Sequence, residues 1–182
     1  MSSRQRLTRA VAAAALVVAP LALAQPAAAQ QAARLDDPTI VAIFDAANSW
    51  DIQTGQLAEK KGTTKAVRDY GAMLSRDHTA VRQMGRDLAK KLGVTPTPPK
   101  NFAMAKDHAA AVATLDGASG KAFDRAFLQH EVAFHKAVID AMNSTFLPSL
   151  QNEEVKDLVK KVEPAFNAHM LAAQNLLDKM AK

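Results

Sequence analysis

The sequence contains no cysteine among its 182 residues, and its only aromatic residues are one Trp, one Tyr and seven Phe. Without cysteine there is neither a disulfide framework nor a thiolate nucleophile, so packing alone must hold the fold together. The few aromatics and β-branched runs disfavour strands, whereas the many Ala, Leu, Val and Met residues suit close-packed helices. A Gly-rich phosphate loop and a G-x-S-x-G motif are also absent. The composition therefore predicts an all-α protein without a recognisable catalytic motif.

Long hydrophobic runs are missing too, except for one near the N-terminus. Three arginines among the first nine residues precede an apolar run of 14 residues, 11–24, with small-residue cleavage sites ending at residues 24 and 29. A membrane anchor needs about 20 apolar residues, so the run is too short. No cysteine follows for a lipid anchor, and the arginines do not form a twin-Arg pair. We therefore expect residues 1–29 to be a signal peptide cleaved after residue 24 or 29, residues 30–37 to be a flexible lead, and residues 38–182 to form one domain.

The expected signal peptide changes the charge and location of the protein. The whole chain has a net charge of +5, but the leader carries three arginines and no acid, which leaves 20 basic and 18 acidic residues. A balance of +2 gives no reason to expect nucleic-acid binding. No apolar run of 18 residues follows the leader, so we expect no transmembrane segment in the mature chain. The periplasm is the expected location, with attachment at the outer membrane or secretion as alternatives, and an oligomer stays possible.

Four long helical segments and one short one follow from the capping and breaking residues. Asp37 and Pro38 are suited to open a helix, whereas Gly62 and Gly93 are suited to end one. The expected helices span residues 38–61, 64–92, 121–147 and 152–180, the third ending before Pro148 and the last kinked at Pro164. Between the second and third, about 28 residues hold a proline-rich stretch and a short helix over 101–115. Short outer links and one long crossover predict a ferritin-like four-helix bundle.

Each long helix turns at least one metal-capable side chain toward its apolar face. On helical wheels, Glu131 and His135 share one face because they are spaced i, i+4, and Asp124 lies there too. Burying such groups without partners costs several kcal/mol, so they are expected to be paired or bound to a metal. A second carboxylate behind an imidazole is a common feature of metal sites. The predicted transition-metal ligands are Asp51, His78, Glu131, His135 and His169, with Asp77 orienting from nearby.

The type of ion follows from the residues that are missing. Classical di-iron bundles carry Glu-x-x-His pairs, and this chain has none, nor a His-x-x-x-Glu pair. A His-rich cluster suits one zinc, copper or iron ion better than a carboxylate-bridged pair, which argues against ferroxidase activity and iron storage. Whether the protein is an enzyme stays open. The alternative is a metal-free network of Asp–His pairs in a stress-response or interaction protein that works through its surface.

The two other histidines and the methionines carry less weight. His108, beside Asp107, is expected to be exposed, and His130 borders the apolar face of its helix. Five methionines at core-like spacings are better explained as core filler than as copper ligands: Met73, Met84, Met142, Met170 and Met180.

Several segments resemble a known family in the family's order: "LAEKKGTTKAVRDYGAMLSRDH", "LGVTPTPP", "LDGASGKAFDRAFLQHEVAFHKAV" and "VEPAFNAHMLAAQNLL". They are similar to DUF4142, exported bacterial ferritin-like domains of unknown function that are often labelled outer membrane proteins. The likeness covers about residues 39–180, and it implies the fold but no reaction. Asp51 departs from the family, which carries the longer Glu there. The family pattern falls on Met73, Asp77, His78, Gly120, Phe123, Asp124, His135, Pro164 and His169.

Overall fold

The structure, a computed structural model, describes residues 35–180. The expected signal peptide lies outside the described residues. The helices are α1 (Asp37–Lys61), α2 (Lys65–Leu92), α3 (Ala103–Gly117), α4 (Gly120–Ala141), α5 (Leu147–Ser149) and α6 (Glu153–Met180), with a π-helical segment, η1, at Met142–Phe146. Residues 35–180 contain no strand, which confirms the all-α prediction. None of the helices in this range is both long and apolar enough to cross a membrane.

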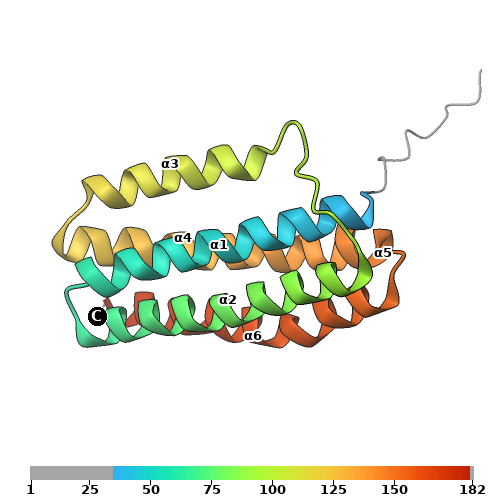
Figure 1. The fold of residues 1–182 in the computed structure, drawn as a ribbon. Coiled ribbons are helices and arrows are strands. Elements are labelled where there is room, and N and C mark those ends of the chain that lie inside the picture. The colour runs from blue at the N-terminus through green and yellow to red at the C-terminus, as the bar shows by residue number, and fades with distance from the viewer. Residues whose placement is uncertain (1–34, 181–182) are drawn as a thin grey trace, which may run out of the picture. The chain divides into compact units, whose positions relative to one another are not determined.

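The four long helices form the bundle that the crossover predicted (Figure 1). α1 packs along α2 and α4, and α6 packs along the same two helices. Neighbouring helices run antiparallel, while α2 and α4 run parallel because the crossover returns the chain to the end where α2 began (Figure 1). Its helix α3 lies outside the bundle against α4 and α1. This is the expected ferritin-like plan with a short extra helix.

Two apolar cores lie along the bundle with a polar layer between them. One core is built from the first half of α1, the second half of α2, the end of α4 with η1, and the first half of α6. The other core uses the opposite ends of the same helices, including Phe123 and Phe127. The buried polar side chains between these two sets of positions come from residues 48–54, 78, 131–135 and 169. The polar layer is therefore an interruption of the core at mid-bundle.

The turn between α1 and α2 explains one of the inward carboxylates. Asp124 is fully buried, and its Oδ1 accepts a hydrogen bond of 2.9 Å from the backbone N–H of Thr63. Its Oδ2 accepts from the Thr63 hydroxyl. Asp124 thus ties α4 to the link between α1 and α2 and lies at that end of the bundle.

The beginning of α1 differs by one residue from the prediction. Asp36, and not Asp37, is the N-cap, because its Oδ1 accepts from the Thr39 N–H at 2.9 Å. Asp37 instead accepts from the backbone N–H groups of Gln151 and Asn152, both at 2.8 Å. Its side chain therefore joins the start of α1 to the link before α6.

The prediction that the third long helix ends before Pro148 is wrong. The chain stays helical through η1 and α5 to Ser149, with Pro148 in the first turn of α5. A proline in the first turn of a helix destabilises it least, because the N–H groups of that turn have no helical partner in any case. The π segment ends just before Pro148, so Pro148 lies in such a first turn. Pro164 lies inside α6, and the kink expected there stays a prediction.

The crossover helix α3 is docked at both ends. Lys61 donates from Nζ to the carbonyls of Leu115 and Asp116, at 2.6 and 2.9 Å, where α3 leaves carbonyls without helical partners. Near the other end, Trp50 stacks on His108, with ring centres 5.0 Å apart and an interplanar angle of 18°. His108 is only 7% exposed, so the expectation that it is exposed is wrong. The packing of α3 on Trp50 buries it.

Candidate metal centre

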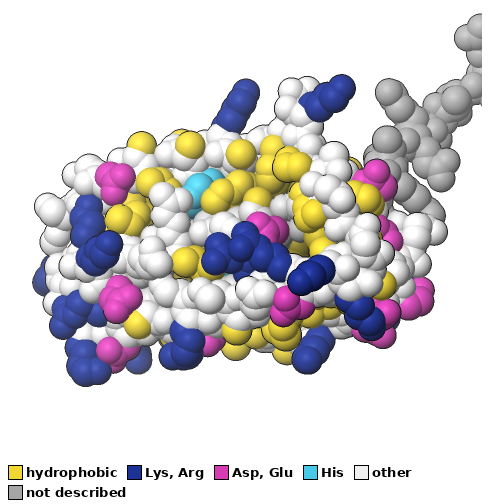
Figure 2. Space-filling model, viewed as in Figure 1, with side chains coloured by type: hydrophobic (Ala, Val, Ile, Leu, Met, Phe, Trp, Pro, Cys, Tyr) yellow, Lys and Arg dark blue, Asp and Glu magenta, His cyan; other side chains and the backbone are white. Residues whose placement is uncertain are grey.

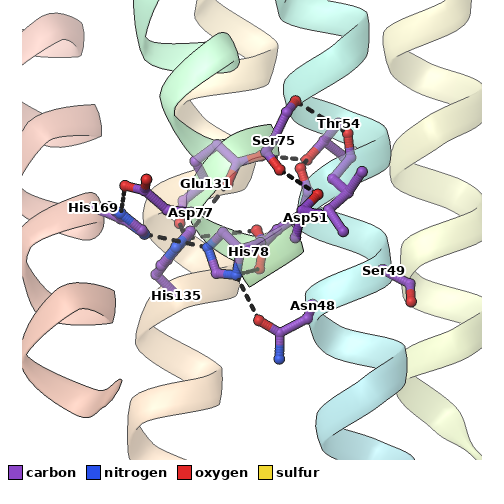
Figure 3. Close-up of polar contacts among 12 residues, drawn as sticks. Asn48, Ser49, Asp51, Thr54, Ser75, Asp77, His78, Glu131, His135 and His169 are labelled. Carbon is purple, nitrogen blue, oxygen red and sulfur yellow. Dashed lines mark hydrogen bonds and ion pairs between the residues drawn. The ribbon is translucent and has the colours of Figure 1, made fainter. Parts of the chain in front are cut away.

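Three imidazoles meet in the polar layer, one each from α2, α4 and α6 (Figure 3). The ring centres of His78, His135 and His169 are 5.1–5.5 Å apart. One ring nitrogen of each lies within 4.8 Å of those of the other two. His78 and His135 are fully buried and His169 is 5% exposed. These distances are short enough for one ion to contact all three rings.

The hydrogen bonds of His78 fix which of its nitrogens carries the proton. Its Nδ1 lies 2.9 Å from Oδ1 of Asn48. The orientation of the Asn48 amide follows from its Nδ2, which donates to the Phe44 carbonyl at 2.8 Å. An amide oxygen only accepts, so Nδ1 of His78 carries the hydrogen and Nε2 keeps its lone pair in the neutral ring.

The same reasoning applies to the other two rings. Nδ1 of His135 lies 3.0 Å from the carbonyl oxygen of Glu131, one turn earlier in α4. Nε2 of His169 lies 3.2 Å from Oδ2 of Asp77. Both acceptors require an N–H, so the lone pairs belong to Nε2 of His135 and Nδ1 of His169.

The lone pairs of His78 and His169 therefore face each other across the space between the rings. Nε2 of His78 and Nδ1 of His169 are 3.2 Å apart, and neither carries a hydrogen in the tautomers just described. Nε2 of His135 is buried and has no hydrogen-bond partner among the described residues. Facing lone pairs repel one another unless a cation lies between them. Imidazole ligands of metals typically donate their other N–H to a carbonyl or carboxylate. Here His135 donates to a carbonyl, His169 to a carboxylate and His78 to an amide oxygen.

The surroundings keep two of the rings, those of His78 and His169, neutral. Burial, together with the neighbouring His135 and His169, lowers the pKa of His78 to about 2. Burial and His135 also lower the pKa of His169, against the opposing effect of Asp77. Neutral imidazoles are the form that binds metals, so these two rings need no deprotonation at physiological pH.

Two carboxylates lie behind the rings, on the side of their N–H groups. Asp51 Oδ2 is 3.5 Å from Nδ1 of His78, and Glu131 Oε2 is 3.4 Å from Nδ1 of His135. Thr54 donates to the other Glu131 oxygen, Oε1, at 2.7 Å. Asp51, Glu131 and His135 form a second group whose potential ligand atoms lie within 4.8 Å of one another. The carboxylates are thus placed to orient and charge-balance the imidazoles.

The surroundings shift the pKa values of these two carboxyl groups, Asp51 and Glu131, in opposite directions. Burial and the adjacent Glu131 raise the pKa of Asp51 well above its usual value. Burial also acts to raise the pKa of Glu131, but the hydrogen bond from His135, together with that from Thr54, outweighs it and lowers that pKa. One shared negative charge, held mainly on Glu131, is the consequence.

The structure brings all six sequence-predicted residues into this one layer but arranges them in an unexpected way. The three imidazoles face one another, while Asp51, Glu131 and Asp77 lie behind them (Figure 3). Sequence reasoning missed Asn48 and Thr54, because it considered only ionisable side chains. Their signal was present: both are three residues from Asp51 and so share its helical face.

No curated protein matches the chain, but a solved structure and a protein family do. A solved structure, described as the crystal structure of a DUF305 fragment from Deinococcus radiodurans, is similar with a TM-score of 0.69. The match covers 78% of this chain and 95% of that chain at 14% sequence identity, so it supports the fold alone. The family described as "Domain of unknown function (DUF4142)" matches residues 22–176. As its motifs predicted, the chain belongs to the DUF4142 family.

Proposed function

We propose that this protein is an exported, periplasmic ferritin-like domain that binds one transition-metal ion through His78, His135 and His169. One observation carries the proposal: one nitrogen of every ring faces an oxygen acceptor, which leaves a lone pair on the other nitrogen of each ring in one buried cluster. Asp51, Glu131 and Asp77 lie behind the rings, where they orient them, and Glu131 supplies negative charge.

The ligand set narrows the choice of ion. Three imidazole nitrogens suit zinc, copper or iron, whereas magnesium and calcium prefer oxygen ligands. Because the carboxylates face the N–H side of the rings, a carboxylate-bridged pair of ions is not favoured. Three protein ligands leave one coordination position open on a tetrahedral ion. The proposal concerns binding, and it assigns no reaction to the protein.

The rival function is that of a metal-free stress-response or interaction protein whose polar layer only fixes helix register. That arrangement requires a proton between Nε2 of His78 and Nδ1 of His169, which lie 3.2 Å apart. The pKa of each ring is lowered, first of all by burial, so holding a proton there is unfavourable. The geometry therefore favours the metal over the network.

Metal content per chain tests the proposal directly. The protein is purified without a polyhistidine tag, exposed separately to zinc, copper and iron(II), and analysed by mass spectrometry of the bound metal. We expect one equivalent of zinc per chain, lost in a His78→Ala/His135→Ala double variant. Asp124→Asn is the matched control, because it alters a buried carboxylate at the end of the bundle. Substoichiometric uptake of every metal, or zinc uptake unchanged in the double variant, would decide for the metal-free protein.

A further inference from the structure

A second pair of histidines lies outside the polar layer, in a pocket between α3 and α4. The pocket has a volume of about 250 Å³. In Figure 2, histidine surface is visible among hydrophobic side chains near α3. The polar or sulfur-bearing side chains of the lining are Met104, Asp107 and His108 from α3 and His130 from α4, and the remaining lining residues are Ala133, Phe134 and Ala137.

As in the central rings, one nitrogen of His108 faces an oxygen acceptor and the other is left with a lone pair. Its Nε2 lies 2.9 Å from Oε1 of Gln53, which accepts the hydrogen and leaves the lone pair on Nδ1. Nδ1 is buried and has no hydrogen-bond partner among the described residues. Trp50, stacked on the ring, fixes its orientation. Burial and the nearby His130 lower the pKa of His108 to about 4, so the ring is neutral at physiological pH. His108 therefore offers a preoriented, unused ligand atom.

Two further potential ligands line the same pocket. The ring centre of His130 is 6.5 Å from that of His108. An ion bound about 2.0–2.1 Å from one nitrogen of each ring holds the ring centres about 5–6 Å apart, so the two rings must approach each other by about 1 Å to share it. Met104 precedes His108 by four residues, so both side chains share one face of α3. The pocket thus combines two imidazoles with a thioether.

We propose that this pocket binds a Cu(I) ion through Met104, His108 and His130. Thioether sulfur is a soft ligand that selects Cu(I) over harder ions. Phe134 and two alanines complete the wall, and Asp107 is the one carboxylate of the lining, which disfavours magnesium, calcium and manganese. The site is separate from the three central histidines and does not depend on them. A water molecule that satisfies Nδ1 of His108 is the competing occupant.

The test isolates the pocket from the centre. In the His78→Ala/His135→Ala variant, Cu(I) is titrated without oxygen against a chromophoric Cu(I) chelator. We expect one equivalent to bind, with affinity at least tenfold lower when Met104→Leu or His130→Gln is added. Met84→Leu is the matched control, since Met84, like Met104, is half-buried and packs on the first apolar core, but it lies in α2 and does not line the pocket. Circular dichroism checks that every variant is folded.

A spectroscopic measurement on the protein with its central histidines intact makes the test independent of the His78→Ala/His135→Ala substitutions. Copper X-ray absorption of the Cu(I)-loaded chain is expected to show a sulfur neighbour that disappears in Met104→Leu. Absence of the sulfur signal, or Cu(I) affinity unchanged in both Met104→Leu and His130→Gln, would overturn the proposal and leave water as the occupant. Zinc uptake by the central histidines is measured separately, so failure of one site does not imply failure of the other.

Discussion

Asp51 is a buried carboxyl group whose surroundings oppose its ionisation. It is 1% exposed, and neither of its oxygens has a hydrogen-bond partner among the described residues. Burial and Glu131 raise its pKa above 3.8, so the folded chain holds a proton that the unfolded chain releases. Stability is therefore lost as the pH rises above about 4. We expect Asp51→Asn to raise the unfolding free energy of the metal-free protein by about 1–3 kcal/mol at pH 7.5, and by much less at pH 4.5.

Urea unfolding of the chelator-treated protein at the two pH values measures this effect. Asp45→Asn is the control, because Asp45 lies in the same helix but is paired with Arg86 near the surface. An Asp51→Asn protein that is less stable than the original at pH 7.5 would contradict the expectation, and would mean that the ionised carboxylate stabilises the layer.

Asp124 contrasts with Asp51, since both of its oxygens have partners in Thr63. Removal of the carboxylate leaves the partly buried backbone N–H of Thr63 without its hydrogen-bond partner. We expect Asp124→Ala to cost about 1–3 kcal/mol of unfolding free energy while zinc uptake stays at one equivalent. Asp116→Ala, at an exposed position, serves as the control in the same denaturant titration. Lost zinc uptake in a folded Asp124→Ala protein would contradict the structural role.

Helical periodicity predicted which side chains turn inward, but not what each one contacts. Asp124 and Glu131 both lie on the inward face of a helical wheel. Asp124 nevertheless accepts a hydrogen bond from Thr63 in the turn after α1, whereas Glu131 lies against the imidazole of His135. Their difference comes from residues far away in the sequence, Thr63 and Thr54. His108 was misjudged for the same reason, because the Trp50 that buries it belongs to another helix.

At the scale of the elements, α1 and α2 approach each other closely where two glycines, Gly55 and Gly71, meet. A Cβ on Gly71 would lie 2.6 Å from the Gly55 carbonyl oxygen and 2.8 Å from the Ala58 Cβ. Backbone atoms cannot yield as a flexible side chain does, so the helices would have to separate. We expect Gly71→Ala to lower the unfolding free energy by about 1–3 kcal/mol, despite the better helix propensity of alanine.

Gly117, at the end of α3, provides the matched control for that substitution. A Cβ there meets nothing within 4 Å, so Gly117→Ala is expected to be neutral or slightly stabilising. Thermal unfolding of both variants makes the comparison. If Gly71→Ala melts at or above the temperature of Gly117→Ala, the close approach does not limit the packing of α1 on α2.

Most element boundaries could be predicted because local residues determine them. Gly62 and Gly93 end α1 and α2 as expected. Pro148 failed as a boundary because the π segment before it depends on the longer-range packing of Met142 and Phe146 in the core. The sequence also predicted a short helix in the crossover, but nothing local indicated that Lys61 would hold its end.

At the scale of the whole molecule, the polar layer is sustained by the two apolar cores on either side of it. Burial in those cores offsets the cost of enclosing ionisable groups at the middle of the bundle. The metal-free protein is sensitive to pH, because the rings of His78 and His169 in this layer, and of His108 outside it, are neutral in the folded state and become protonated when the chain unfolds below pH 6.5.

The direction of that sensitivity follows from the pKa values. Burial, the first cause in each case, lowers the pKa of His78, His108 and His169 below 6.5. Below pH 6.5 the unfolded chain therefore binds more protons than the folded one, and each imidazole removes up to about 1.4 kcal/mol of stability per pH unit. Asp51 acts in the opposite direction with one proton, so a net difference of two protons is left. We expect the unfolding free energy to fall by up to about 2.7 kcal/mol per pH unit between pH 6 and pH 5.

Zinc separates this pH effect from metal binding. At pH 7.5, a hundredfold excess of zinc over its dissociation constant is expected to add about 2.7 kcal/mol, because the ion binds only the folded state. For a domain of this size the melting temperature rises by several degrees, and a chelator reverses the change. Urea titrations from pH 7.5 to pH 5, with zinc or with chelator, measure both effects in one series. A curve that depends on pH but is identical with zinc and chelator would leave only the hydrogen-bonded network. A curve that is flat in chelator would show that the folded chain already holds protons on these rings, contrary to the lone pairs on which the metal site depends.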